Sequence, residues 1–338
     1  MNNNVRNRRP TMRDVASLAG VSTATVSMVI NGRNKFTPEV TQRVLAAIKS
    51  LNYQPNAAAS SMVTGRTRCI GLAILDIRNP YFSNIAQGAN SIAQPLGYSL
   101  IIADTAENPQ QAFPQLNALA SRVDGLIVSS RLPEACIDQL LDFGKPIVMF
   151  GQTDRNEAQH LKTSSVQVNS HKAGYMLGRH LYETGRRNIT YVSFPHSLWD
   201  SYRLQGLRDA MPTCAIRVIP VPTQSMEAGE NIAANVLLDG NEIDAVVCYN
   251  DMIAIGLMHE AYNLGVLQPG RIAIAGFDNI PAARFLTPPL TTVDLCSELQ
   301  GVCATERLLE ILETGDRTIT EKLLEPRLVV RASTAAHP

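Results

Sequence analysis

The 338-residue sequence predicts a small all-α head with a helix-turn-helix, joined by a short linker to a larger α/β body with parallel sheets. Three observations support this prediction. Helical patterns separated by turn residues occupy positions 1–54, and basic residues are concentrated in the same region. From Cys69 onward, short apolar runs alternate with helical stretches, which is typical of parallel sheets covered on both faces by helices.

The head is expected to contain three short helices. Thr11 and Ser22 are candidate N-caps of the first two, and Gly20 between them allows a tight turn. Thr37 is placed to cap the third helix and is followed directly by proline, which suits the first helical position. A glycine turn between two short helices is the pattern of a helix-turn-helix.

The charge of the chain is distributed unevenly. Residues 1–68 contain ten Lys or Arg and two Asp or Glu, which gives a net charge of +8. Because the whole chain contains 30 residues of each kind, the remaining residues carry −8. A basic head on an acidic body indicates that the head meets a polyanion.

Several classes of protein are not expected from the motifs. The six cysteines and six histidines are scattered without C-x-x-C or H-E-x-x-H spacing, so neither a metal site nor a disulfide framework is predicted. An enzyme with a cofactor is not expected either, because the sequence has no G-x-G-x-x-G after a strand, no nucleophile–base pair and no phosphate loop. The N-terminus does not resemble a signal peptide, and no apolar run approaches the length of a membrane span, so a cytoplasmic protein without a membrane partner is expected.

The body is expected to bind its ligand at the ends of parallel strands. The apolar runs predicted as strands are CIGLAIL, YSLIIA, DGLIVS, PIVMF, ITYVSF, IDAVVCY and RIAIAGF. The helical stretches between them cover residues 83–96, 109–122, 171–185, 202–211 and 250–265. In open α/β sheets, ligands bind beyond the carboxyl ends of the strands.

The stretch MRDVASLAGVSTATVSMVING resembles the head of the LacI/GalR family of bacterial transcriptional repressors. It contains every fixed position of the family pattern D-V-A-x-x-A-G-V-S-x-x-T-V-S-x-V-[LI]-N, from Asp14 to Asn31. The stretch LNYQPNAAASSM matches the pattern N-Y-x-P-N-x-x-A-x-x-L that follows in the family. Further matches in the body are LDIRNPYF, RLQGLRDA, CYNDMIAIG and IAIAGFDNIPAARFLTPPLTTV, so the resemblance covers nearly the whole chain.

The resemblance implies a division of the chain into functional parts. Residues 1–54 would form the DNA-binding head, and residues 55–68 a hinge helix and linker. Residues 69–331 would form the body that binds the effector and dimerises, and residues 332–338 a tail.

The body would be two-lobed, like periplasmic sugar-binding proteins, with the effector in the cleft between the lobes. Lobe one would contain about residues 69–167 and 295–324. Lobe two would contain about residues 168–294 and 325–331.

The resemblance assigns DNA contacts to the second helix of the head and to the hinge. Its phosphate-holding positions are Ser22, Thr25, Ser27 and Asn31, and Thr11 is counted with the DNA-binding residues. Thr23, Ala24 and Met28 stand at the base-reading positions. None of these three can make the bidentate hydrogen bonds that read guanine or adenine, so a modest, thymine-friendly contact is expected. The remaining specificity would come from half-site spacing and from the deformability of the DNA.

The hinge is expected to be helical on DNA and to enter the minor groove. Asn56 would cap this helix, and Ala59 would allow close contact with its copy in the other subunit. Met62 stands where the family has a leucine that wedges between base pairs, and it is apolar and of similar size. A flexible linker is the alternative for this segment.

In the cleft, the resemblance implies that Arg203, Asn250 and Asp278 form hydrogen bonds with the hydroxyl groups of the effector. A guanidinium, an amide and a carboxylate can satisfy the donors and acceptors of a polyol. Asp76 and Phe82 would close the effector site on the side of the other lobe. The alternative is structural: Asp278 would cap a helix and Arg203 would pair with an acid.

The only tryptophan, Trp199, is expected either to supply a flat apolar face for a sugar ring or to belong to the core. Three positions depart from the family pattern. Phe150, Gly151 and Gln152 replace the usual I-D-R, so its aspartate is missing. Asn279 stands for a second aspartate and Gln224 for an aromatic residue, so the effector of any one relative does not transfer directly.

The resemblance therefore implies a sequence-specific DNA-binding transcriptional regulator, namely a repressor of carbohydrate-metabolism genes. A sugar or sugar phosphate in the cleft would release it from a pseudo-palindromic operator. One alternative keeps the DNA binding and makes the effector a co-repressor such as a purine. Another is a sugar-binding transport protein. The last strand is followed by no leucine heptad, so a homodimer is expected.

Overall fold

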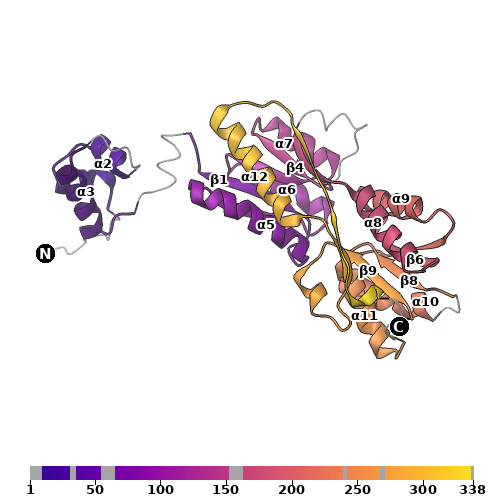
Figure 1. Ribbon diagram of the computed structural model, residues 1–338. Coiled ribbons are helices and arrows are strands. Elements are labelled where there is room, and N and C mark those ends of the chain that lie inside the picture. Colours follow the sequence, from indigo (N-terminus) through magenta and orange to yellow (C-terminus); the bar gives the residue numbers. More distant parts are fainter. Residues whose placement is uncertain are drawn as a thin grey trace. The chain divides into compact units, whose positions relative to one another are not determined.

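The computed structural model describes residues 10–30, 36–54, 65–151, 163–238, 242–266 and 271–335. It divides the chain into two compact units, Met1–Thr67 and Arg68–Pro338 (Figure 1). Each unit has a hydrophobic core of its own. No helix among the described residues is long and apolar enough to cross a membrane.

The first unit contains the helices α1 (Met12–Ala19), α2 (Thr23–Ile30) and α3 (Pro38–Ser50). The backbone N–H and the hydroxyl of Thr11 both donate to the Asp14 carboxylate at 2.7 Å, which fixes the start of α1. Gly20 ends this helix in the left-handed region, with φ of 65°. The predicted helix-turn-helix is therefore confirmed.

The core of the head is small and depends on a few aliphatic side chains. One valine from each helix is fully buried, and alanines and a tyrosine fill the space around them. The buried members are Val15, Ala16, Ala19, Val26, Val44, Ala47 and Tyr53. Because α2 contributes a single fully buried side chain, most of its surface remains available to a partner.

The second unit contains two six-stranded sheets, as the alternation of apolar runs predicts. Both are parallel, except that the last strand of the second sheet runs antiparallel to its neighbour. The first sheet, in spatial order, contains β11 (Glu321–Leu324), β5 (Ser164–Val168), β4 (Ile147–Phe150), β3 (Gly125–Ser129), β1 (Cys69–Ile74) and β2 (Ser99–Asp104). The second contains β12 (Arg327–Val329), β10 (Thr291–Asp294), β9 (Ala273–Phe277), β8 (Ala245–Cys248), β6 (Asn188–Ser193) and β7 (Ala215–Pro220).

Helices cover each sheet and make it one lobe (Figure 1). Lobe one contains α5 (Pro80–Ala93), α6 (Pro109–Ala120), α7 (Glu134–Asp142) and α12 (Ser297–Thr314). Lobe two contains α8 (Ser170–Glu183), α9 (Leu198–Ala210), α10 (Met226–Leu237) and α11 (Asp251–Asn263). Short 3₁₀ turns lie at Gln94–Leu96, Pro281–Arg284 and Ala332–Thr334.

The chain passes between the lobes at the ends of three strands. After Val168 it leaves the first sheet, after Asp294 it returns to lobe one through α12, and after Leu324 it enters the second sheet again. The resemblance implies crossings near these same positions. Three connections of this kind join the two lobes.

Neighbouring helices within the lobes meet backbone to backbone. A Cβ atom on Gly174 of α8 would lie 2.0 Å from the Arg203 carbonyl oxygen, and one on Gly206 of α9 would lie 1.9 Å from the His171 carbonyl oxygen. Glycine is required at both positions, since any side chain would force the helices apart. Equivalent reciprocal glycines lie between α5 and α12 and between α10 and α11: Gly88, Gly301, Gly229 and Gly256.

Candidate functional site

The N-terminus of α2 presents short, uncharged side chains. Ser22 Oγ accepts the Thr25 N–H at 3.1 Å, and the two hydroxyl oxygens lie 2.9 Å apart. These hydroxyls therefore cap the helix and remain exposed or half-buried at its end. Thr23 and Ala24 are exposed beside them. A capped helix N-terminus with exposed hydroxyls is a suitable place for a phosphate.

The other predicted DNA contacts are distributed around this end. Ser27 and Met28 of α2 are half-buried, and Thr11 is half-buried in its capping box with Asp14. Asn31, Asn56, Ala59 and Met62 lie outside the described residues, as does Gln152.

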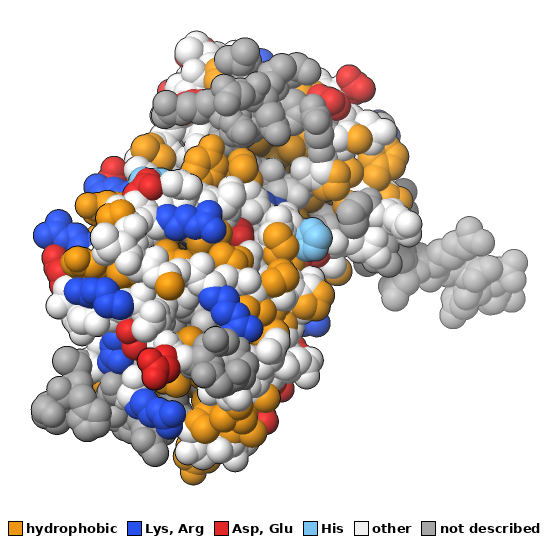
Figure 2. Space-filling view, turned by 90° about the vertical axis from the view of Figure 1, so that its right-hand side faces the viewer, with side chains coloured by type: hydrophobic (Ala, Val, Ile, Leu, Met, Phe, Trp, Pro, Cys, Tyr) orange, Lys and Arg blue, Asp and Glu red, His pale blue; other side chains and the backbone are white. Residues whose placement is uncertain are grey.

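The helix α2 carries no charged side chain, and the exposed cations of the head include Arg13 of α1 and Arg43 and Lys49 of α3. On the face shown in Figure 2, the lysine and arginine side chains are separated from one another, and acidic side chains lie beside several of them. Residues 1–68 have a net charge of +8, and such an excess of cations favours binding to phosphates.

In the second unit, side chains from both lobes meet at the carboxyl ends of the strands. Arg131 follows β3 and Gly151 follows β4 in lobe one, while Trp199, Gln224 and Asp278 follow β6, β7 and β9 in lobe two. All five are largely withdrawn from solvent. This is where open α/β sheets bind their ligands, so the cleft between the lobes is the candidate effector site.

Arg203 is the most deeply buried cation of the cleft, with 1% of its surface exposed. Its Nη1 donates to the Tyr249 carbonyl oxygen at 2.5 Å, and Nη2 lies 3.9 Å from Asp278 Oδ1. The guanidinium also stacks over the rings of Tyr249 and Phe277, at 4.7 and 4.9 Å from their centroids. The predicted pairing of Arg203 with an acid thus exists, and the acid is the other candidate site residue, Asp278.

Asp278 is held at the bottom of the cleft by its backbone. Its φ is 108°, a strained value for a residue with a side chain, and its N–H donates to Val293 O at 2.9 Å. Burial raises the pKa of Asp278 to about 7, although the charges of Arg203 and Arg131 lower it. Near neutral pH the carboxyl group is therefore present in both protonation states. The 3₁₀ turn after it is preceded by Ile280, so Asp278 is not its N-cap.

Asn250 has a positioning role in this state of the protein. Its Oδ1 accepts the Ile253 N–H at 2.9 Å and caps α11, and its Nδ2 donates to the Gln224 carbonyl oxygen at 3.2 Å. The amide nitrogen carries two hydrogens, so an effector can accept from the second one while the first holds the Gln224 carbonyl oxygen.

On the side of lobe one, Tyr81 rather than Phe82 faces lobe two. Phe82 is buried between Tyr81 and Phe150, with ring centroids at 5.2 and 6.5 Å. The Tyr81 ring lies 5.8 Å from the Trp199 ring in an edge-on arrangement. Asp76 forms a two-pronged ion pair with Arg78, at 2.9 and 3.0 Å.

Trp199 fills the space left by the missing aspartate. A Cβ atom on Gly151 would lie 2.3 Å from Cζ2 of the indole, and the φ of 99° at Gly151 also favours glycine. Trp199 is 4% exposed, so it is packed like a core residue. It nevertheless reaches lobe one, which makes it both a core residue and part of the cleft.

Glu107 and Arg131 form a link between the lobes that the sequence pattern did not indicate. Arg131 Nη2 donates to Glu107 Oε1 at 2.8 Å, and Gln224 Nε2 of lobe two donates to the same oxygen. The Arg131 guanidinium stacks over the rings of Phe194 and Trp199, at 5.2 and 5.5 Å. One carboxylate therefore joins the two lobes. The position of Arg131 just after an apolar strand was a signal that could have identified it.

Arg131 is also incompletely paired. Its side chain is 9% exposed, and Nε and Nη1 have no hydrogen-bond partner within the described residues. A buried donor without an acceptor costs about 1–3 kcal/mol, and more when it is charged.

Comparison with known proteins gives consistent matches over both units. Residues 11–56 match the model of bacterial regulatory proteins of the lacI family, and residues 67–332 match that of periplasmic binding proteins and the sugar binding domain of the LacI family. The HTH-type transcriptional repressor PurR of Histophilus somni (strain 129Pt) is 34% identical, over 96% of this chain and 98% of the relative. PurR of Proteus mirabilis (strain HI4320) is 35% identical, over 97% and 98%.

Solved structures with the same architecture have comparable coverage. The lac repressor dimer bound to operator and the anti-inducer ONPF has a TM-score of 0.85 and 25% identity, over 97% of this chain and 100% of that one. The complex of the transcriptional regulator CelR with cellobiose has a TM-score of 0.70 and 26% identity, over 96% and 100%.

Proposed function

Because this chain belongs to the LacI family of bacterial transcriptional repressors, we propose that a sugar or sugar derivative in its cleft acts as inducer and releases it from operator DNA. Membership of the family makes it a DNA-binding regulator rather than an enzyme. The observation that carries the proposal is the buried pair of Arg203 and Asp278, which faces the aromatic side chains of lobe one. A planar guanidinium and a carboxyl group can satisfy adjacent hydroxyl groups of a sugar.

Release would follow from differential affinity. An effector that binds better to the DNA-free arrangement of the lobes weakens operator binding, and operator DNA then weakens effector binding by the same factor. The site lies between the lobes, so ligand contacts to both of them change with their relative position. A transport role, the alternative from another class, does not account for the helix-turn-helix head.

A purine co-repressor is the second candidate. It is favoured by the similarity to PurR along nearly the whole chain, and by the flat rings of Tyr81 and Trp199 in the cleft. A thermal-shift screen of the full-length protein against sugars, sugar phosphates and nucleobases separates the two candidates, because a ligand of the native state raises its stability. A nucleobase that raises the melting temperature and strengthens operator binding would contradict the inducer proposal.

We propose that Thr23, Ala24 and Met28 are the residues of the head that face the base edges of the operator, and that their contribution to specificity is modest. Replacement of Met28 by arginine is expected to favour guanine at the contacted base pair, by roughly 5- to 100-fold, because arginine bonds guanine O6 and N7 together. Selection from a randomised operator pool measures this change. Met28→Leu is the matched control, which keeps an apolar contact and should keep the wild-type preference. An unaltered preference in Met28→Arg would show that this position does not face the bases.

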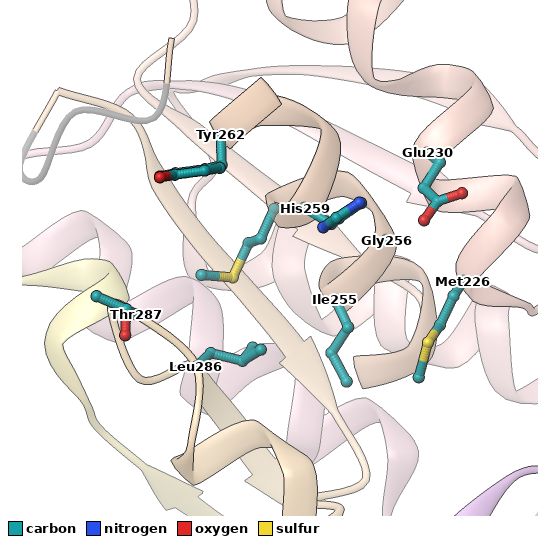
Figure 3. A pocket seen from close by; sticks show the side chains of 9 residues that line it. Met226, Glu230, Ile255, Gly256, His259, Tyr262, Leu286 and Thr287 are labelled. Atoms are coloured by element: carbon teal, nitrogen blue, oxygen red, sulfur yellow. The ribbon is translucent and has the colours of Figure 1, made fainter. Parts of the chain in front are cut away.

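We propose that the protein is a homodimer and that lobe two contributes to the interface. A hollow of about 620 Å³ lies between α11, α10 and the loop that carries Leu286 and Thr287, and Met226, Ile255 and Met258 line it (Figure 3). Beside this hollow, Tyr262 and Phe285 are 74% and 73% exposed. Large apolar side chains gathered at a surface are typical of protein interfaces.

Replacement of Tyr262 by aspartate is expected to shift the protein towards monomers and to weaken operator binding by at least about tenfold, since two linked heads bind two half-sites together. Sedimentation velocity and DNA titration measure both effects. Phe143→Asp is the matched control, because Phe143 is an exposed aromatic side chain of lobe one, next to α7. Equal dimer stability in the two variants would show that the surface around Tyr262 is not the dimer interface.

A further inference from the structure

Arg131 has side-chain donors without an acceptor within the part of the chain that the structure describes. Its Nη2 is paired with Glu107 at 2.8 Å, while Nε and Nη1 are buried without a partner within the described residues. Buried polar groups in native proteins are almost always paired, and exceptions need an explanation. A ligand with several acceptor atoms would pair these donors.

The unpaired donors lie in the effector cleft. Arg131 follows the carboxyl end of β3 and stacks on Phe194 and Trp199, which belong to lobe two. Its charge also lowers the pKa of Asp278, so the two side chains share one electrostatic environment. A molecule held by Arg203 and Asp278 would therefore have Arg131 within its surroundings.

The donors left on Arg131 favour an anion. A guanidinium group stays charged at any physiological pH. Glu107 pairs with Nη2 alone, so Nε and Nη1 still present donors of a positively charged group within the described residues. Such donors form stronger hydrogen bonds with a negatively charged acceptor than with a neutral one.

We propose that Arg131 is an anion-binding subsite of the cleft, so that the effector carries a carboxylate or phosphate group. A sugar acid or a sugar phosphate meets this requirement, whereas a neutral sugar or a nucleobase does not. The inference rests on the proposed function, because it assumes that the cleft holds the effector. Glu107 then acts as the internal counter-ion that shares Arg131 with the ligand.

Two single substitutions are expected to act in opposite directions. Arg131→Gln removes the cation and should weaken anion binding by about 10- to 100-fold, the range typical of a hydrogen bond to a charged group. Glu107→Gln removes the competing carboxylate and should strengthen it. Arg131→Lys keeps the charge without the planar donors and should bind with intermediate affinity.

The experiment measures the melting temperature of the full-length protein with sodium phosphate or sodium formate, against sodium chloride at equal ionic strength. Phosphate or formate is expected to stabilise the wild type and Glu107→Gln more than Arg131→Gln. A response to formate alone would assign the subsite to carboxylates, and a response to phosphate alone to phosphates. Equal shifts in all three proteins would overturn the inference, because the anion would then bind elsewhere.

Calorimetric titration with glucose, gluconate and glucose 6-phosphate separates this inference from the proposed function. The acidic compounds are expected to bind more tightly than glucose, with the difference lost in Arg131→Gln. If glucose binds as tightly as the acids and Arg131→Gln has no effect, the subsite is wrong while the sugar proposal stands. If a purine nucleotide binds with the same dependence on Arg131 and is the ligand that alters operator binding, the subsite stands and the sugar proposal fails.

Discussion

Deletion of residues 1–66 is expected to abolish operator binding, with a loss of at least about 1000-fold in affinity, because specific binding exceeds non-specific binding by such factors. The deleted part contains α2 and the concentrated positive charge, whereas the acidic body has a core of its own. The truncated chain should still dimerise and bind the effector, since Arg203, Asp278 and Tyr262 all belong to the second unit.

The operator for this test comes from selection of random DNA with the full-length protein. Fluorescence anisotropy at a fixed salt concentration then measures affinity, and sedimentation measures the oligomeric state. The intact protein with Asp209→Asn is the control, because this change alters one exposed side chain of the body and leaves the head unchanged. Operator affinity retained by the truncated chain would show that the body itself binds DNA.

The second large effect is expected from Asp278→Asn. Operator binding should be unchanged, because Asp278 belongs to the second unit, but release by the effector should be lost as effector affinity falls by about 10- to 100-fold. Asn keeps the shape of the side chain and cannot ionise. Asp209→Asn is the control, since this aspartate is exposed and pairs with His171 at the surface, away from the cleft strands. A normal response in Asp278→Asn would remove Asp278 from the effector site.

The same variant tests the electrostatics of the cleft. The ordinary pKa of Asp is 3.8 and that of folded Asp278 is about 7, so the folded state holds its proton more strongly than the unfolded chain. Asp278 therefore contributes to the free energy of unfolding fully below about pH 4. This contribution, up to roughly 4 kcal/mol, is lost as the pH rises through 7. The melting temperatures of the wild type and Asp278→Asn should therefore diverge as the pH rises between these values, with the variant the more stable at pH 8. The same dependence of melting temperature on pH in both proteins would contradict the raised pKa.

The sequence predicted the parts of the fold that local rules control. Capping residues such as Thr11 and Ser22 set helix starts within a few positions, and continuous apolar runs mark strands that are buried on both faces. The apolar runs do not include β5, β7 or β10, because polar or charged residues interrupt these strands. The short strands β11 and β12 are not included either, because they contain charged residues. Their places in the two sheets depend on pairing with strands far away in the sequence.

The candidate site was predictable to a lesser degree. Arg203 and Asp278 were predicted as effector-binding residues only from their positions in the family pattern, and the structure brings the two side chains together. Contacts between the lobes could not be predicted, because Glu107, Arg131 and Gln224 come from three separate loops. The sequence nevertheless showed that Gln224 replaces an aromatic residue of the family pattern. This glutamine is the residue of lobe two that bonds to Glu107.

Asn250 shows a different limit. An asparagine directly before an apolar helix is a typical N-cap, and this local role was available from the sequence alone. Its assignment to the effector came from the resemblance. Both roles use the same amide, so the static contacts of one state do not decide between them.

The reciprocal glycines between helices determine how each lobe can respond to a ligand. Gly174 touches the main chain at Arg203, and the remaining pairs bring the other helices equally close. Main chains in direct contact cannot shear past one another without a clash, so each lobe is stiff on the scale of a bound sugar. A ligand that displaces Arg203 therefore moves α8 and α9 together. The conformational change on binding has to be concentrated at Val168, Asp294 and Leu324, where a few backbone torsions can rotate one whole lobe relative to the other.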